Sequence, residues 1–296
     1  MAAALFARRL DLLGERLGIP EPTLGLLTAL AADAPELCSA AAAVIGGHVA
    51  VGEGVVVGSN MFNLAAMIGL SAILAGCVRL ERETLVREGA VALAAVALGG
   101  GVLLGALPAW LALLAMAAGA VPYVRWLSGL HPVPRGRPVL AGRHRAALEM
   151  SRLFVMELPA LVVIVVGSVG MVDAAVHLAG RWGASQRVVG LLVLATMTSL
   201  PNALTAIRLG LGGRASALVA ETLNSNTINL AGGLVVPSLF VTVTASGGAG
   251  LDVAALAALT AGTLLLVGRR AGAGRIAGAA VITGYLAWLT VRLASG

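Results

Sequence analysis

Two segments of the chain repeat each other at an offset of 166 positions. Residues 29–64 align with residues 195–230 without a gap. Nine positions of the first copy meet identical residues in the second, namely Ala29, Pro35, Ala40, Gly46, Gly47, Ser59, Asn60, Asn63 and Leu64. In both copies polar residues interrupt apolar sequence. Duplicated apolar segments with such interruptions are the sequence pattern that best indicates the binding site of a transporter.

The composition indicates a membrane protein. Hydrophobic residues make up 59% of the 296 positions and charged residues 11%, whereas soluble domains carry roughly 25% charged residues. Long apolar runs recur along the whole chain without the period-2 alternation of barrel strands, and a spanning helix needs about 20 apolar residues. The sequence therefore predicts an all-α polytopic membrane protein, a helical bundle embedded in the lipid bilayer.

We expect about nine transmembrane helices. Their predicted ranges are 22–45, 49–76, 89–106, 108–127, 153–179, 187–210, 215–244, 251–268 and 274–293. Between the two halves lies an Arg-rich segment whose Pro and Gly residues argue against a long helix. The chain thus divides into a first half (1–127, with the repeat 29–72), a basic loop (128–152) and a second half (153–296, with the repeat 195–238).

The arginines predict the orientation of these helices. With the basic loop in the cytoplasm, 17 of the 20 arginines lie inside and three lie outside, namely Arg181, Arg187 and Arg292. This distribution satisfies the positive-inside rule, and we expect the plasma membrane as the location. The two copies then cross the membrane in opposite directions. Inverted repeats of this kind place the substrate near the midplane and permit alternating access.

Acidic and polar residues of the first copy indicate a cation site. Asp33 and Glu36 lie near the middle of the first span, where an acid costs roughly 2.5–3.5 kcal/mol on insertion scales. Pro35 removes a helix donor and interrupts the span, so we expect free carbonyl groups that can coordinate a cation. On the next span, Ser59 and Asn63 are four residues apart and share the helix face toward this interruption.

The second copy supplies hydroxyl and amide groups instead of acids. The position equivalent to Glu36 holds Asn202, and the other polar residues here are Thr198, Ser199, Ser225, Asn226 and Asn229. Glu221 lies one turn before Ser225, toward the cytoplasmic end of the same helix. It either guards the inner entrance to the site or pairs with Arg214.

These motifs resemble the two repeats of the calcium/cation antiporter superfamily, of the sodium/calcium exchanger type. The similar segments are APEL (34–37), GSNMFN (58–63), TSLPN (198–202) and NSNTIN (224–229). The resemblance implies a ten-helix antiporter that exchanges Ca²⁺ for Na⁺ or H⁺ at a site built from both repeats. Residues 1–18 are too few and too charged to span, so we expect that most of the first helix is missing.

The resemblance also implies ligand roles for residues of both copies. Glu36 matches the ligand acid of the first repeat, but Asn202 stands where the family carries its second acid, which weakens the case for a divalent ion. If Asp33 turns inward, the site retains two carboxylates; if it does not, one negative charge favours a monovalent cation or a proton-linked cycle. The candidate cation ligands are Asp33, Glu36, Ser59, Asn63, Thr198, Ser199, Asn202, Glu221, Ser225 and Asn229.

Structural roles compete with these assignments. Membrane hydroxyls often bond to a carbonyl one turn earlier, and amides such as Asn60, Asn224 and Asn226 often link helices. We interpret Glu53, Asp173 and Glu157 as interfacial charges.

Other classes of function receive little support. The basic residues lie in loops without interleaved aromatics, so we expect no nucleic-acid binding, and the lack of a GxxxxGK[ST] loop argues against a nucleotide-driven pump. The four histidines fall in loops or at span ends, away from any buried serine, so we expect no enzyme. The expected partners are inorganic cations and lipid, with no tightly bound cofactor and an unknown oligomeric state. A non-transporting relative that only binds a cation is the remaining alternative.

Overall fold

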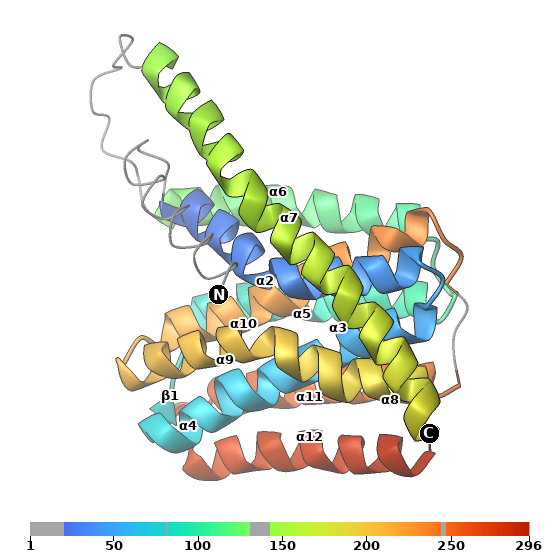
Figure 1. Cartoon of the computed structure of the whole chain (residues 1–296). Helices are drawn as coiled ribbons and strands as arrows, with labels where there is room; N and C mark the ends of the chain where they lie inside the picture. The colour runs from blue at the N-terminus through green and yellow to red at the C-terminus, as the bar shows by residue number, and fades with distance from the viewer. Residues whose placement is uncertain (1–20, 81, 131–142, 244–246, 296) are drawn as a thin grey trace.

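The computed structural model describes residues 21–80, 82–130, 143–243 and 247–295. In these ranges several helical segments follow one another along the same axis, so that the described chain forms nine helical rods (Figure 1). The first half consists of α2 (Glu21–Ile45), α3 (Val49–Asn63), the π-helix η1 (Leu64–Gly69), α4 (Leu70–Ala75), β1 (Cys77–Val78), α5 (Arg82–Leu103) and α6 (Ala109–Leu130). The second half consists of α7 (Arg143–Trp182), α8 (Gln186–Val189), the π-helix η3 (Gly190–Leu194), α9 (Ala195–Leu211), α10 (Ala215–Ile228), the π-helix η4 (Asn229–Val235), η5 (Pro237–Leu239), α11 (Ala249–Val267), β2 (Ala273–Gly274) and α12 (Arg275–Ser295).

This arrangement confirms the predicted all-α bundle. Among the described residues, six helices are long and apolar enough to cross a membrane. The observed helices differ from the predicted ranges at their ends. Helix α5 begins at Arg82, before its predicted start, and α7 begins at Arg143, which lies inside the predicted basic loop. The middle of that loop and the segment expected to hold the incomplete first helix fall outside the described residues.

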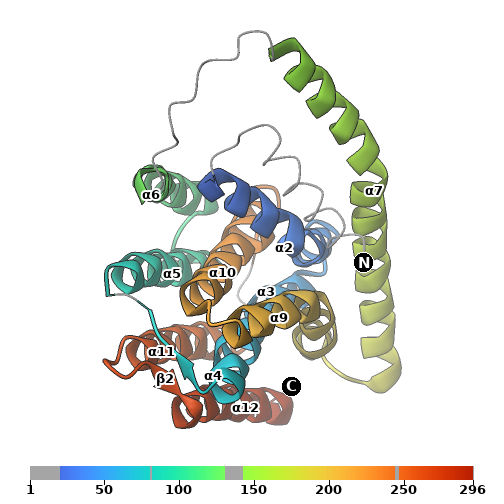
Figure 2. The ribbon, with the colours of Figure 1, turned by 90° about the vertical axis from the view of Figure 1, so that its left-hand side faces the viewer.

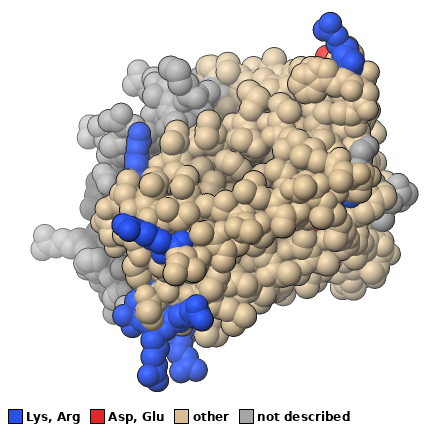
Figure 3. All heavy atoms as spheres, turned by 90° about the horizontal axis from the view of Figure 1, so that it is seen from below, with Lys and Arg blue, Asp and Glu red and all other residues tan. Residues whose placement is uncertain are grey.

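The surface has the polarity that a bilayer requires. Apolar side chains are widely exposed, including Val166 at 65% and Leu265 at 76%. In the face shown in Figure 3, most of the arginines gather toward the end where β1 lies in Figure 1, and the middle of that face is uncharged. β1 pairs with β2 in an antiparallel arrangement, which places the loops bearing Arg79 and Arg269 on one side of the bundle, as the predicted orientation requires.

The two sequence copies fold into the same helical hairpin. α2 and α3 are joined at Gly47 (φ 83°), and α9 and α10 are joined at Gly213 (φ 72°). The next residues, His48 and Arg214, both have φ −92° and ψ 53°. A π-helical segment directly follows the second helix of each hairpin, η1 after α3 and η4 after α10. Because α2 and α9 run in opposite directions (Figure 1), the repeats are inverted.

Helix α3 lies in the interior, and its glycines allow the hairpins to cross closely (Figure 2). All residues from 51 to 61 are buried. A Cβ atom at Gly58 would lie 2.6 Å from the carbonyl oxygen of Leu191, and one at Gly190 would lie 2.5 Å from that of Val51. Small residues at such crossings let membrane helices approach backbone to backbone. The polar residues of both copies are therefore brought together in the bundle core.

Candidate cation site

A reciprocal pair of asparagines joins the two repeats. Asn60 Nδ2 donates to the carbonyl oxygen of Asn226 at 3.1 Å, and Asn226 Nδ2 donates to the carbonyl oxygen of Asn60 at 3.1 Å. The two residues occupy equivalent positions of the repeats, so the contact lies where the halves are related by local twofold symmetry. The interpretation that these amides link helices is confirmed.

Both acids of the first copy meet donors from the second. Asp33 Oδ1 accepts hydrogen bonds from Asn202 Nδ2 at 2.6 Å and from Ser225 Oγ at 2.8 Å. Glu36 Oε2 accepts one from Asn229 Nδ2. Asp33 is 2% exposed and Glu36 is 1% exposed. Asp33 therefore turns inward, so that both carboxylates belong to one buried cluster.

The remaining amides complete this cluster. Asn63 Nδ2 donates to Ser225 Oγ at 3.3 Å and to Asn226 Oδ1 at 3.1 Å. In the equivalent contact of the other repeat, Asn229 Nδ2 donates to Asn60 Oδ1 at 3.3 Å. Hydrogen bonds thus connect Asn202, through both repeats, to Glu36. We call these eight hydrogen-bonded residues the midplane cluster: Asp33, Glu36, Asn60, Asn63, Asn202, Ser225, Asn226 and Asn229.

Several oxygen atoms of predicted ligands are buried in the described structure without a hydrogen-bond partner. Six of them are Asp33 Oδ2, Glu36 Oε1, Ser59 Oγ, Asn63 Oδ1, Ser199 Oγ and Asn229 Oδ1, and Glu221 Oε2 is a seventh. The Ser199 hydroxyl lies beside the Glu36 carboxylate. An unsatisfied buried polar group costs about 1–3 kcal/mol, so these groups require compensation. Carboxylate, amide and hydroxyl oxygens are the ligands that hard cations prefer.

The described residues contain no group of three or more His, Cys, Asp and Glu side chains suited to a metal ion. Neutral oxygens must therefore supply most of any coordination shell here. A site of this kind differs from a transition-metal centre, which uses imidazole or thiolate ligands.

Two candidate ligands, Thr198 and Glu221, form no hydrogen bond with the midplane cluster in the described structure. Thr198 Oγ1 donates to the carbonyl oxygens of Leu194 and Ala195, at 2.9 and 3.2 Å, in its own helix. Glu221 is partly buried, and within the described residues it forms no ion pair with Arg214. Ligand roles for Thr198 and Glu221 remain predictions.

The predicted interruption of the first span is wrong. Helix α2 continues through Pro35, and α9 continues through Pro201. Each proline removes one helical hydrogen bond, but the surrounding helices hold the rod in place. Ser168 of α7 donates from Oγ to the carbonyl oxygen of Pro35 at 3.3 Å. The cluster is therefore built from side chains on continuous helices.

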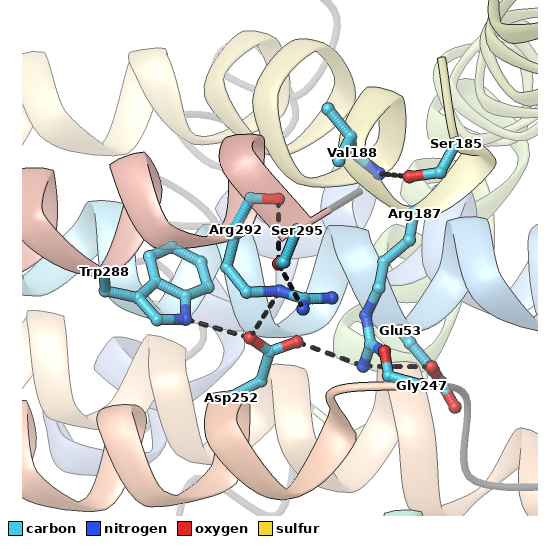
Figure 4. A network of polar contacts seen from close by, with 9 residues as sticks. All are labelled: Glu53, Ser185, Arg187, Val188, Gly247, Asp252, Trp288, Arg292 and Ser295. Atoms are coloured by element: carbon cyan, nitrogen blue, oxygen red, sulfur yellow. Dashed lines mark hydrogen bonds and ion pairs between the residues drawn. The ribbon is translucent and has the colours of Figure 1, made fainter. Parts of the chain in front are cut away.

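A second buried polar cluster lies near the predicted outer ends of the helices (Figure 4). Arg187 Nη2 lies 3.1 Å from Glu53 Oε2 and 3.1 Å from Asp252 Oδ2. Arg292 Nε lies 3.0 Å from Asp252 Oδ1, which also accepts a hydrogen bond from Trp288 Nε1 at 2.9 Å. We call Glu53, Arg187, Asp252 and Arg292 the outer ion-pair network. It connects α3, α8, α11 and α12.

Glu53, interpreted from the sequence as an interfacial charge, is buried inside the protein. Its side chain is 0% exposed, because Arg187 approaches it where α8 packs on α3. This contact could not be predicted from the sequence, since Glu53 and Arg187 lie far apart in the chain and the distribution of arginines predicts only that Arg187 lies on the outer side. An acid one turn into a span, opposite a lone outer arginine, is the pattern that would have indicated it.

Similarity to known proteins agrees with this architecture. The family model for the sodium/calcium exchanger protein matches residues 1–130 and 153–294. Among solved structures, the sodium-calcium exchanger NCX_Mj soaked with 10 mM Na⁺ and zero Ca²⁺ is 18% identical with a TM-score of 0.67, covering 98% of this chain and 93% of that chain. The Ca²⁺/H⁺ antiporter protein YfkE is 17% identical with a TM-score of 0.64, covering 98% and 91%. No curated protein sequence matches significantly.

Proposed function

Since the chain belongs to the sodium/calcium exchanger protein family, and is therefore a membrane transporter of cations rather than an enzyme, we propose that it exchanges Ca²⁺ for Na⁺ or H⁺. The ligands in this proposal are Asp33, Glu36 and the neutral oxygens around them. The midplane cluster would be opened alternately to the two sides of the membrane, as inverted repeats allow.

The unpartnered oxygens carry this proposal. Two carboxylates and four neutral side chains each present a buried oxygen without a hydrogen-bond partner. Ca²⁺ takes about six to eight oxygen ligands, whereas a transition metal would select nitrogen or sulfur. One similar structure is that of a sodium-calcium exchanger, and another is that of a Ca²⁺/H⁺ antiporter, which supports the same cargo here.

A second candidate is antiport of a monovalent cation and H⁺. Both carboxylates already accept an amide N–H, from Asn202 and from Asn229 respectively. At these two positions the second repeat contributes neutral groups and no further charge, and fewer ligand charges lower the affinity for a divalent ion. We also propose a plasma-membrane location with residues 128–152 in the cytoplasm, on the basis of the arginine distribution.

Ion flux into proteoliposomes tests these assignments. Purified protein is reconstituted, and fluxes of Ca²⁺, Na⁺ and K⁺ are measured against opposing Na⁺ or pH gradients. We expect Ca²⁺ uptake driven by an outward Na⁺ or H⁺ gradient, and loss of this uptake in Glu36→Gln. Uptake of Na⁺ or K⁺ alone would select the monovalent candidate. Ca²⁺ binding without any flux would indicate a cation-binding protein that does not transport.

A further inference from the structure

A further buried carboxylate lies outside both the midplane cluster and the outer ion-pair network. Glu88 is 2% exposed and lies six residues after Arg82, where α5 begins. At 1.5 Å per residue it lies about 9 Å along the helix from this predicted cytoplasmic end. An acid held inside a membrane bundle is costly and is usually functional. The proposed exchange at Asp33 and Glu36 assigns no role to Glu88.

The Tyr123 hydroxyl connects Glu88 to the helix that carries Ser225. Tyr123 Oη, from α6, lies 3.0 Å from Glu88 Oε1 and 3.1 Å from Glu88 Oε2. The same oxygen lies 3.0 Å from Asn224 Oδ1 on α10. Ser225 follows Asn224 directly and donates to Asp33 at 2.8 Å. Two side-chain contacts and one peptide unit thus connect Glu88 to Ser225 of the midplane cluster, and one further hydrogen bond leads to Asp33.

Within the described structure, the Tyr123 phenol is the titratable group that faces Glu88. Helix α10 carries Glu221, which forms no hydrogen bond or ion pair with Glu88, and η4 carries no titratable residue. Asp252 of α11 is held in the outer ion-pair network. On α5 itself, Arg87 pairs with Glu83 at 2.8 Å. No described arginine neutralises Glu88.

The number of protons available for these hydrogen bonds indicates which protonation state of Glu88 fits the geometry. A phenol donates one hydrogen bond, and a carboxylate only accepts. With Glu88 ionised, the single Tyr123 proton would face both the carboxylate and Asn224 Oδ1, so one acceptor would lose its partner. With Glu88 protonated, the acid donates to Tyr123 Oη and Tyr123 donates to Asn224 Oδ1, so that each contact has its own proton. Loss of the Glu88 proton therefore requires Tyr123 and Asn224 to rearrange.

We propose that Glu88 is a proton-binding site whose ionisation, transmitted through Tyr123 and Asn224 to Ser225, couples the cation site to the pH of the cytoplasmic side. The proton comes from water on that side and returns to it, and no other covalent bond changes. This inference rests on the proposed antiport function and names H⁺ as an ion that the transport cycle takes up and releases.

The pH dependence of transport tests the coupling. Ca²⁺ flux is measured in proteoliposomes while the pH at the cytoplasmic face is varied. For one titrating group, the rate of the wild-type protein should change by up to about tenfold per pH unit. Glu88→Gln should retain flux and lose this dependence, and Tyr123→Phe should displace it along the pH axis. Glu83→Gln is the matched control, because Glu83 lies on the same helix but is 67% exposed. A pH profile of Glu88→Gln that equals the wild-type profile would overturn the coupling and leave the antiport function intact.

Infrared spectroscopy tests the proton site without relying on transport. The spectrum of wild-type protein minus that of Glu88→Gln should contain the carbonyl band of a protonated acid, lost as the pH is raised. Tyr123→Phe, which keeps the acid and removes its phenol partner, should shift the band. If Glu88→Gln does not fold, the shift in Tyr123→Phe relative to wild type decides the question. Absence of a titrating band in the wild-type protein would overturn the proposal, whatever the flux measurements show.

Discussion

Replacing Asp252 by Asn should destabilise the protein severely. The Asp252 carboxylate is 0% exposed and lies 3.1 Å from Arg187 and 3.0 Å from Arg292. The substitution removes one of the two negative charges in the outer ion-pair network and turns an amide N–H toward guanidinium groups. Arg187 would then keep its ion pair with Glu53, and Arg292 would lose its ion pair with Asp252. Removing one partner of a buried pair costs about 3–5 kcal/mol, because the remaining charge stays buried without compensation.

The pair of Arg87 with Glu83 offers a matched control. Its atoms are 2.8 Å apart, but the side chains are 41% and 67% exposed. Exposed pairs at this helical spacing contribute about 0.3–0.5 kcal/mol. Glu83→Gln should therefore change stability by roughly a tenth of the effect of Asp252→Asn, although both variants remove one carboxylate charge from an ion pair.

Thermal unfolding in detergent, followed by tryptophan fluorescence, measures this difference. Trp288 donates to Asp252 at 2.9 Å, so its emission also reports on the network directly. With a change of about 2–4 °C per kcal/mol, Asp252→Asn should lower Tm by at least about 6 °C and Glu83→Gln by less than about 2 °C. Equal values of Tm in the two variants would refute the view that burial makes this network strong.

Three further variants test the midplane cluster and the helix crossing. Glu36→Gln should abolish the rise in Tm that added Ca²⁺ produces, because it removes one of the two carboxylates; an unchanged rise would exclude Glu36 as a ligand. Asn202→Glu removes the donor that Asp33 uses at 2.6 Å and adds a third acid, so Tm should fall without cations while calorimetry detects tighter Ca²⁺ binding; equal affinity would contradict this expectation. Gly58→Ala should cost about 1–3 kcal/mol of stability, since its Cβ would lie 2.6 Å from Leu191 O. Gly167→Ala is the control, because a Cβ there would have no atom within 4 Å, and this variant should change Tm little. Similar Tm values for the two variants would show that the helix crossing tolerates a methyl group.

The helices could be predicted from sequence because a helix that spans the bilayer needs an apolar run long enough to match the thickness of its hydrocarbon core. Most predicted ends fall within a few residues of the observed ones. The start of α5 was missed because Arg82 and Arg87 are too polar for a membrane core, although a helix continues readily into the interface. For the same reason the beginning of α7 at Arg143 was assigned to a loop.

The composition of the midplane cluster was predictable, but its contacts were not. The offset of 166 residues pairs Asn60 with Asn226 in the sequence itself. Whether Asp33 turns toward Asn202 depends on the rotation of α2 against α9, which packing decides and sequence spacing does not. The outer ion-pair network has no counterpart in the other copy, because the position equivalent to Glu53 holds Val219. Internal repetition therefore could not identify it.

Both carboxylates of the midplane cluster belong to the first repeat, while the second contributes hydroxyl and amide groups. Two identical inverted halves would make the outward-open and inward-open states equivalent, with equal affinity for the ion. Here one hairpin holds all the negative charge, so the outward-open and inward-open states are not equivalent. The side of the bound cation that faces water differs between the two states. We therefore expect the cation to bind with different strength from the two faces of the membrane, while the ion gradients set the direction of net exchange.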